Sequence, residues 1–206
     1  MIIETLVVGP LGVNCYLVGD EASREGMIID PGADSAVILQ RAKSLTLEIK
    51  FIVLTHGHFD HIGALKDVKD ATKAVVAVGE KDAAALRQLD PISAAFGFSY
   101  PLPPAADRLL KDGDILEIGP LHFKILETPG HTPGGICLYG EKSAFTGDTL
   151  FYAGIGRTDL PGGNTDTIME SIRTKLLTLP DDVMVYPGHG PESTIGRERR
   201  QNPFLS

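Results

Sequence analysis

Three of the six histidines in this 206-residue chain fall within one short stretch, His-Gly-His-Phe-Asp-His at residues 56–61. On an extended segment His56 and His58 project to the same side, and Asp60 and His61 follow where we expect the chain to turn into a helix. Imidazole and carboxylate groups are ligands that zinc, iron and manganese accept, and two such ligand sets side by side can hold two ions. The stretch therefore predicts a metal site.

Three more histidine or aspartate residues lie in a comparable position, directly after a short apolar run. They are His131 in TPGHTPGG after FKILE, Asp148 in GD after SAFT, and His189 in PGHG after VMVY, while FIVLT precedes the histidine stretch. Glycine, and often proline, beside each of them favours a tight turn. If the four apolar runs are strands that end at a common edge, one centre collects His56, His58, Asp60, His61, His131, Asp148 and His189.

A single histidine is more often an ordinary surface or core residue than a metal ligand, so both interpretations apply to each position. His122 fits the ordinary one, because it alternates with apolar residues in LHFKILE and has no potential ligand beside it. We expect His122 to face solvent on a strand. The seven residues above differ, because a His-x-His-x-Asp-His run and three further strand ends repeat one pattern. Metal binding is the better interpretation for them.

The elements that would position these residues alternate between apolar runs and amphipathic segments. The runs at 2–8, 15–19 and 27–30 are separated by glycine-containing turns and predict consecutive antiparallel strands. We expect an α/β fold in which two mixed sheets pack together with helices outside. Further strands are predicted at 51–55, 74–78, 114–118, 121–128, 134–140, 143–147 and 183–187. Helices are predicted at 34–47, with Asp34 or Ser35 as N-cap, from about 61, and at 80–89, 166–179 and 192–200.

Residues 90–107 contain four prolines and no clear periodicity, which predicts a long loop of the kind that often forms a lid or binding segment. No linker or charge block divides the chain, so we expect residues 1–206 to form a single domain. No apolar run approaches the roughly 18 residues that a membrane span requires. The N-terminus has no basic residue before an apolar run and does not resemble a signal peptide, so we expect a cytoplasmic protein.

The charge balance argues against some classes of partner. The formal net charge is −8, and no basic stripe is present to attract nucleic acid or an anionic membrane. Cys15 and Cys137 are the only cysteines, and each is flanked by strand-like apolar residues, so we expect two buried thiols. The expected partner is thus a small molecule, and the sequence is silent on oligomeric state.

These motifs resemble the metallo-β-lactamase superfamily, and the resemblance spans essentially the whole chain, with its His-x-His-x-Asp-His motif at residues 56–61. It implies an αββα sandwich and a metal-bridging hydroxide as nucleophile. It also implies two divalent ions, zinc foremost, with iron or manganese as alternatives. The implied ligands are His56, His58 and His131 for one metal, Asp60, His61 and His189 for the other, and Asp148 as the bridge.

Within the superfamily the chain is similar to the hydroxyacylglutathione hydrolase (glyoxalase II) branch and to its relative, the persulfide dioxygenases. The similar stretches are TPGHTPGG at 128–135, GDTLF at 147–151, GIGRTDLPGG at 154–163 and RERRQNPFL at 197–205. Asp148 stands where many β-lactamases carry cysteine, and with no secretion signal this disfavours an antibiotic-degrading role. The sequence ends at Ser206, without the C-terminal helical domain that contacts glutathione in glyoxalase II, so glutathione recognition stays open.

A thioester is a suitable substrate for such a centre, because a thiolate with a conjugate-acid pKa of about 8.5 leaves without obligatory protonation. Asp60 is the candidate catalytic residue, since one carboxylate oxygen can bind metal while the other accepts a hydrogen bond from water. Arg157 is the candidate for binding a substrate carboxylate, and the resemblance implies a glutathione-contacting basic residue there.

We therefore expect a dinuclear metal-dependent hydrolase of a small thioester, such as a hydroxyacylglutathione. The alternatives are a hydrolase of another small ester or lactone, a mononuclear-iron persulfide dioxygenase, and a non-catalytic metal-binding module. The dioxygenase would hold its iron with His56, His131 and Asp148.

Overall fold

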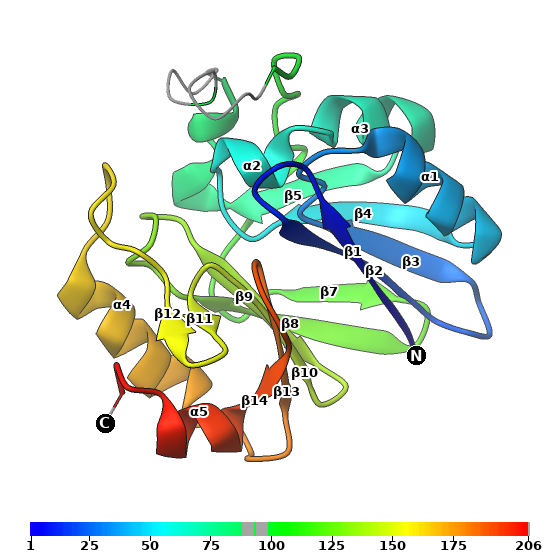
Figure 1. The fold of residues 1–206 in the computed structure, drawn as a ribbon. Helices are drawn as coiled ribbons and strands as arrows, with labels where there is room; N and C mark the ends of the chain where they lie inside the picture. The colour runs from blue at the N-terminus through cyan, green and yellow to red at the C-terminus, as the bar shows by residue number, and fades with distance from the viewer. Residues whose placement is uncertain (88–92, 94–98, 206) are drawn as a thin grey trace.

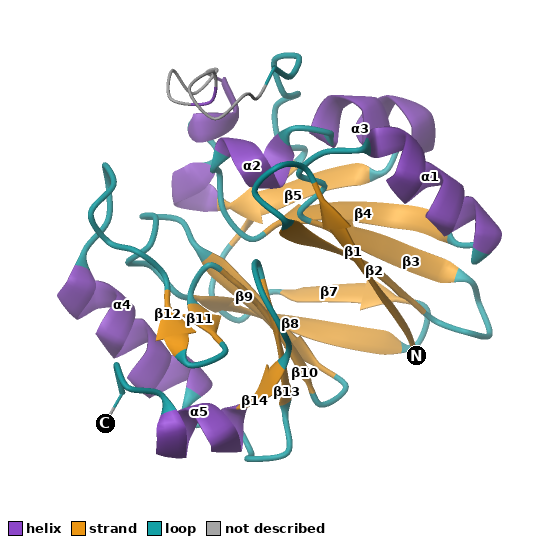
Figure 2. Ribbon diagram, viewed as in Figure 1, coloured by secondary structure: helices purple, strands orange, loops and turns teal. Residues whose placement is uncertain are grey.

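Two six-stranded sheets lie face to face in the computed structural model, which describes residues 1–87, 93 and 99–205 (Figure 1). Helices α1 (Ser35–Ser44) and α3 (Leu65–Thr72) cover the outer side of one sheet, and α4 (Thr165–Ser171) and α5 (Ile195–Gln201) cover the other, as Figure 2 shows. This arrangement confirms the predicted α/β sandwich of two mixed sheets with helices outside.

The first sheet contains the strands of the N-terminal half, in the order of the sequence. Its first three strands pair antiparallel, and the next three continue in parallel. The antiparallel start confirms the prediction for the first thirty residues. The strands are β1 (Ile2–Val8), β2 (Val13–Gly19), β3 (Glu25–Ile29), β4 (Glu48–Leu54), β5 (Val75–Gly79) and β6 (Arg108–Leu110).

The second sheet has the order β14-β13-β10-β9-β8-β7, in which only β10 and β13 run parallel among the pairs of described strands. A small hairpin of β11 (Leu150–Phe151) and β12 (Gly154–Ile155) follows β10. The strands of this sheet are β7 (Ile115–Ile118), β8 (Leu121–Glu127), β9 (Ile136–Gly140), β10 (Ser143–Gly147), β13 (Met184–Pro187) and β14 (Ser193–Thr194).

Apolar side chains fill the space between the sheets and under the helices. Tyr16, Met27, Phe123 and Phe145 lie between the sheets, and all are at most 2% exposed. Tyr16 and Phe145 meet edge to face with ring centroids 5.2 Å apart. Truncating such a buried aromatic to alanine costs about 3–5 kcal/mol, so this layer contributes strongly to stability. Separate clusters under α1 and α3, and under α4 and α5, complete the core.

The predicted helix over residues 80–89 is wrong for the part that the structure describes. Residues 80–87 form two short 3₁₀ turns, η1 (Glu80–Asp82) and η2 (Ala85–Arg87), and residues 88 and 89 lie outside the described residues. The alanines favour a helix, but the carboxylate of Asp82 turns inward to accept two backbone hydrogen bonds. Tertiary contact overrides local propensity here.

Other differences concern element ends. Asp34 precedes α1, but its carboxylate accepts a hydrogen bond from Gly9 N at 2.9 Å and does not cap the helix. The helix predicted from about 61 is divided into α2 (Phe59–Ile62) and α3, and the one over 166–179 begins as α4 and continues as a π-helical turn, Ile172–Leu176. The short strands β6 and β14 were missed. The loop predicted over 90–107 lies partly outside the described residues.

No helix among the described residues is long and apolar enough to cross a membrane. His122 lies on β8 with an exposed side chain, and its Nε2 lies 3.4 Å from Glu117 on the neighbouring strand. The expectation that it faces solvent is therefore confirmed. Cys15 and Cys137 are both free and fully buried, as predicted. That residues 1–206 form one domain stays a prediction.

Candidate metal centre

The structure brings all seven predicted ligand residues to one end of the two sheets. His56 follows β4, His131 follows β8, Asp148 follows β10, and His189 follows β13. The sheets therefore meet where these four strands end, and α2 adds Asp60 and His61 from its single turn. Four of the seven side chains belong to buried residues, and His58, Asp148 and His189 are half-buried.

The side chains form two groups of three with one aspartate between them. In the first group the ligand atoms of His56, His58 and His131 lie within 4.8 Å of one another. In the second group the same limit holds for Asp60, His61 and His189.

Asp148 contacts both groups. Its Oδ2 lies 3.5 Å from Nε2 of His131, and its Oδ1 lies 3.5 Å from Nε2 of His61. Asp60 Oδ2 in turn lies 3.4 Å from Nε2 of His189. This arrangement fits two adjacent cations with a shared carboxylate.

Several of these atoms are buried without a partner. Among the described residues, Nε2 of His56, His61 and His131 and Oδ1 of Asp148 are buried and have no hydrogen-bond partner. Leaving a buried polar atom unsatisfied costs about 1–3 kcal/mol, so such atoms are rarely left without a purpose. Imidazole nitrogens and carboxylate oxygens that face one space are the donor set of zinc and iron sites. The residues present therefore fit a pair of metal ions.

Hydrogen bonds behind the centre turn the histidine rings toward it. His61 Nδ1 lies 3.0 Å from Asp30 Oδ2, and His131 Nδ1 lies 2.8 Å from the carbonyl oxygen of Arg157. His56 Nδ1 lies 3.0 Å from Thr55 Oγ1, which itself donates to Asp30 Oδ2 at 2.6 Å. Acceptors at Nδ1 fix a ring N–H there and turn Nε2 toward the centre.

Asp30 and Thr55 were missed in the sequence, although a signal for Asp30 exists. Asp30 ends the run MIID before Pro31, which is the same strand-end position that identified the other aspartates and histidines. It is only 1% exposed and adopts a left-handed backbone with φ of 50°. Its carboxylate therefore contacts His61 and Thr55 on the side of the rings that faces away from the centre.

The loop that carries His189 is fixed by the start of β2. Asn14 Nδ2 donates to the carbonyl oxygens of Pro187 and Gly190, at 3.0 and 2.9 Å, and Tyr16 Oη donates to Pro187 at 2.6 Å. The loop passes so close to the centre that a Cβ on Gly188 would overlap Asp148 Oδ1 and lie 2.9 Å from His61 Cε1. Only glycine fits there.

The electrostatics of the cluster favour a bound cation. Burial, together with neighbouring histidines, holds the pKa of His56 well below its usual value and lowers the pKa of His58 to about 4. Burial also disfavours charge on His61, but the nearby carboxylates of Asp148 and Asp30 outweigh it and raise its pKa to about 10. Burial opposes ionisation of Asp60, yet hydrogen bonding and nearby histidines lower its pKa to about 2. The carboxylates around the centre thus stabilise positive charge there.

Arg157, the predicted substrate-binding residue, lies beside the centre through its backbone, which accepts the hydrogen bond from His131. Its guanidinium is exposed and forms a bidentate pair with Asp159, with Nε–Oδ1 and Nη2–Oδ2 distances of 2.8 and 2.7 Å. A ligand carboxylate at Arg157 therefore competes with Asp159 for the same donors.

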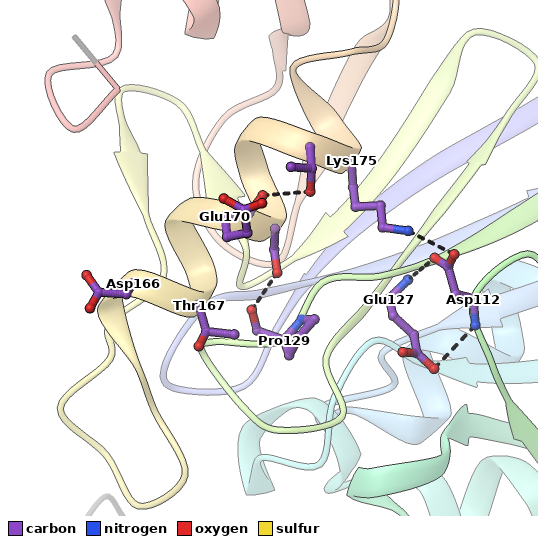
Figure 3. Close-up of a pocket in the computed structure, with 9 residues that line it drawn as sticks. Asp112, Glu127, Pro129, Asp166, Thr167, Glu170 and Lys175 are labelled. Carbon is purple, nitrogen blue, oxygen red and sulfur yellow. Dashed lines mark hydrogen bonds and ion pairs between the residues drawn. The ribbon is translucent and has the colours of Figure 1, made fainter.

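A separate surface hollow lies away from the cluster, between α4 and the end of β8 (Figure 3). Several of its polar groups are paired with one another. Lys175 Nζ lies 2.8 Å from Asp112 Oδ2, Glu127 N donates to Asp112 Oδ1, and Ser171 Oγ donates to the carbonyl of Pro129 at 2.7 Å. Pro129 stands two residues before His131, so the hydrogen bond from Ser171 joins α4 to the loop that carries that histidine.

Comparison with known proteins supports the same interpretation. The sequence profile of the Metallo-beta-lactamase superfamily matches residues 8–189. Hydroxyacylglutathione hydrolase GloC from Haemophilus influenzae is 42% identical, over 100% of this chain and 99% of its own length. The crystal structure of BLEG-1 B3 metallo-beta-lactamase has a TM-score of 0.93 at 38% identity and covers 100% of both chains. TTHA1623, in a di-iron-bound form, has a TM-score of 0.89 at 36% identity, over 98% of this chain and 100% of its own.

Proposed function

Because the chain belongs to the metallo-beta-lactamase superfamily, we propose that it is a metal-dependent hydrolase with two metal ions at the cluster described above. The observation that carries the proposal is the convergence of seven ligand side chains, four of which (His56, His61, His131 and Asp148) have a buried Nε2 or Oδ1 atom without a hydrogen-bond partner among the described residues.

We assign the ligands by the two groups of the structure. His56, His58 and His131 would hold one ion, and Asp60, His61 and His189 the other. Asp148 would bridge the two, because its two oxygens face one histidine of each group at 3.5 Å. Zinc suits this donor set, and iron does as well, as the di-iron form of TTHA1623 illustrates for that protein.

Two bound divalent ions would supply an activated water as nucleophile and a Lewis acid for the substrate carbonyl oxygen. Asp60 would orient that water and take up its proton, because its carboxylate faces the centre and lies 3.4 Å from His189 Nε2. With Asp60 and Asp148 as the carboxylate ligands of two dications, the centre would stay positive toward an oxygen that gains negative charge.

The substrate that we propose is a small thioester of the hydroxyacylglutathione type. GloC, a relative over its full length, carries that activity in its name. A thiolate leaving group needs no dedicated acid, which suits a centre built from metal ligands. Arg157 would bind the carboxylate of the thiol portion in exchange for its present partner, Asp159. Glutathione offers such carboxylates.

A second candidate activity is hydrolysis of a β-lactam, since the similar BLEG-1 structure is described as a B3 metallo-beta-lactamase. The amide of a β-lactam leaves as an amine and gains from protonation, whereas the thioester does not. A panel of substrates that contains both a thioester and a β-lactam therefore distinguishes the two activities.

The test joins metal analysis to a substrate panel. Elemental analysis of protein purified without added metal should give two ions per chain. The panel contains a hydroxyacylglutathione, a lactone, a phosphodiester, a chromogenic cephalosporin and a persulfide with oxygen monitoring. We expect turnover of the thioester, and Asp60→Asn should lose about 100-fold or more of the rate, with its metal content measured alongside.

Each of the other possible outcomes would change one part of the proposed function. Two ions with turnover of the cephalosporin, lactone or phosphodiester alone would overturn the thioester assignment and leave the centre in place. One iron per chain with persulfide-dependent oxygen consumption would replace the hydrolase by a dioxygenase. Unchanged hydrolysis in Asp60→Asn would remove the role of Asp60, and absence of bound metal would remove the centre itself.

A further inference from the structure

Asp82 is a buried carboxylate that lies outside the seven proposed ligands. It stands in η1 directly after β5 and is 4% exposed. Among the described residues, no lysine, arginine or histidine side chain forms an ion pair with it. A buried carboxylate without a cation must have its charge stabilised by hydrogen bonds.

Both oxygens of Asp82 accept backbone hydrogen bonds, and the two donors belong to different loops. Oδ2 accepts from Gly57 N at 3.0 Å, and Oδ1 accepts from Gly134 N at 2.6 Å. Gly57 lies between His56 and His58, after a strand of the first sheet. Gly134 lies three residues after His131, in the loop between two strands of the second sheet. The carboxylate thus spans the junction between the two sheets.

The close approach depends on glycine at both donor positions. A Cβ on Gly134 would lie 2.6 Å from Asp82 Oδ1, and a Cβ on Gly57 would lie 2.7 Å from Ala85 Cβ. These contacts are shorter than a side chain tolerates, so neither loop can carry a larger residue at its point of contact with residues 82–85. One direct backbone hydrogen bond, from Ile136 N to Thr55 O at 2.9 Å, also joins the two segments, directly before His56.

The three histidines next to these contacts are those of one ligand group. The ring centroids of His56 and His131 are 4.9 Å apart, and those of His58 and His131 are 4.6 Å apart. Two of the rings come from the loop of Gly57 and the third from the loop of Gly134. The separation of the two loops therefore sets how closely the three nitrogen atoms can approach one ion.

We propose that Asp82 is a positioning residue that fixes His131 relative to His56 and His58 and so sets the metal affinity of that ligand group. The inference rests on the proposed function, because it requires that these histidines bind metal. In the second group, His61 is held by Asp30 and the loop of His189 by Asn14, so we expect that group to depend less on Asp82.

The experiment measures zinc affinity by competition with a chromogenic chelator. Asp82→Asn is introduced into two backgrounds, so that the two metal positions can be measured separately. In His189→Ala only the position formed by His56, His58 and His131 has all its ligands. In His58→Ala only the position formed by Asp60, His61 and His189 has all its ligands. An asparagine amide can accept only one of the two backbone bonds. We expect affinity to fall about 10- to 100-fold in the His189→Ala background and to change less than about twofold in the His58→Ala background.

Glu80→Gln is the matched control, because Glu80 lies in the same turn with an exposed carboxylate. It should leave both affinities unchanged. Asp82→Ala should give the same selectivity as Asp82→Asn with a larger loss, and circular dichroism and the melting temperature establish that each variant folds. If Asp82→Ala does not fold, the milder Asp82→Asn still decides the question.

Equal loss at both positions would show a general structural role and overturn the proposal, as would unchanged affinity at both. Failure of the inference is distinguishable from failure of the proposed function. If the unmodified protein binds two zinc ions and the Asp82 variants bind them equally well, only the role of Asp82 is wrong. If the unmodified protein binds none, the metal centre is wrong and the inference falls with it.

Discussion

His61 donates a hydrogen bond from Nδ1 to Oδ2 of Asp30 at 3.0 Å, and both side chains are at most 2% exposed. The same oxygen accepts from Thr55, whose hydroxyl contacts Nδ1 of His56. One carboxylate therefore orients a histidine in each of the two ligand groups. This relationship distinguishes Asp30 from Asp82, which serves one group.

Asp30→Asn should weaken metal binding at both positions. An asparagine has one acceptor oxygen, so either Thr55 N or the pair formed by His61 and the Thr55 hydroxyl faces an NH2 group in place of an acceptor, and the support behind the rings is weakened. We expect the affinity of each position to fall about 10- to 100-fold, measured by zinc competition titration. Asp70→Asn, at an exposed carboxylate on α3, is the control. Full zinc affinity in Asp30→Asn would contradict this role.

Removal of metal should lower the melting temperature. The proposed ligands come from both sheets, so a bound ion stabilises the folded chain against the unfolded one. At a free metal concentration about 1,000 times the Kd, binding contributes about 4 kcal/mol. For a chain of this size that corresponds to roughly 8–16 °C. Calorimetry with and without a chelator measures the difference, and added zinc should reverse it; equal melting temperatures would count against a metal centre.

Glu198 on α5 should be required for stability. It is fully buried and accepts hydrogen bonds from Ala153 N and Asn202 Nδ2, both at 2.9 Å, and from Ser193 and Arg197. Glu198→Ala leaves these donors unsatisfied, and we expect a loss of about 3 kcal/mol. Urea unfolding measures it.

Glu170→Ala is the comparison for that experiment, because Glu170 is exposed and only its backbone oxygen accepts the hydrogen bond from Thr174. It should change the free energy of unfolding by less than about 0.5 kcal/mol. Similar losses in both variants would show that the buried network contributes little.

Both cysteines should resist thiol reagents in the folded protein. Burial raises the pKa of the Cys137 thiol to about 11 and that of Cys15 well above its usual value. At pH 8 each group is therefore protonated as well as inaccessible, whereas the thiolate is the reactive form. An absorbance assay should find no reaction in native buffer and two thiols per chain in denaturant. Rapid labelling of one thiol before unfolding would contradict the burial.

The sequence predicts those parts of the fold and cluster that depend on local pattern. His131, Asp148 and His189 each come after a recognisable strand and directly after a glycine, so their positions at the strand ends could be predicted. The structure brings them together with the His-x-His-x-Asp-His stretch. Their roles as metal ligands stay predictions.

Features that depend on contacts between distant segments were not predictable. Asp82 accepts hydrogen bonds from the backbone N–H groups of two loops. Because every residue except proline has such a group, the donor positions show nothing in the sequence except that both are glycine. The inward turn of Asp82 also explains why an alanine-rich stretch does not continue as a helix. The pairing of Arg157 with Asp159 is visible only in the structure, because many acidic side chains could reach that guanidinium.

The chain passes from the first sheet to the second once within the described residues, between β6 and β7. The segment before that crossing carries His56, His58, Asp60 and His61. The segment after it carries His131, Asp148 and His189. A gene divided at Gly113 in this connection would yield two fragments, each with an incomplete set of donors. We expect such fragments to reassemble more tightly with metal than without it, so the pair would serve as a genetically encoded metal sensor.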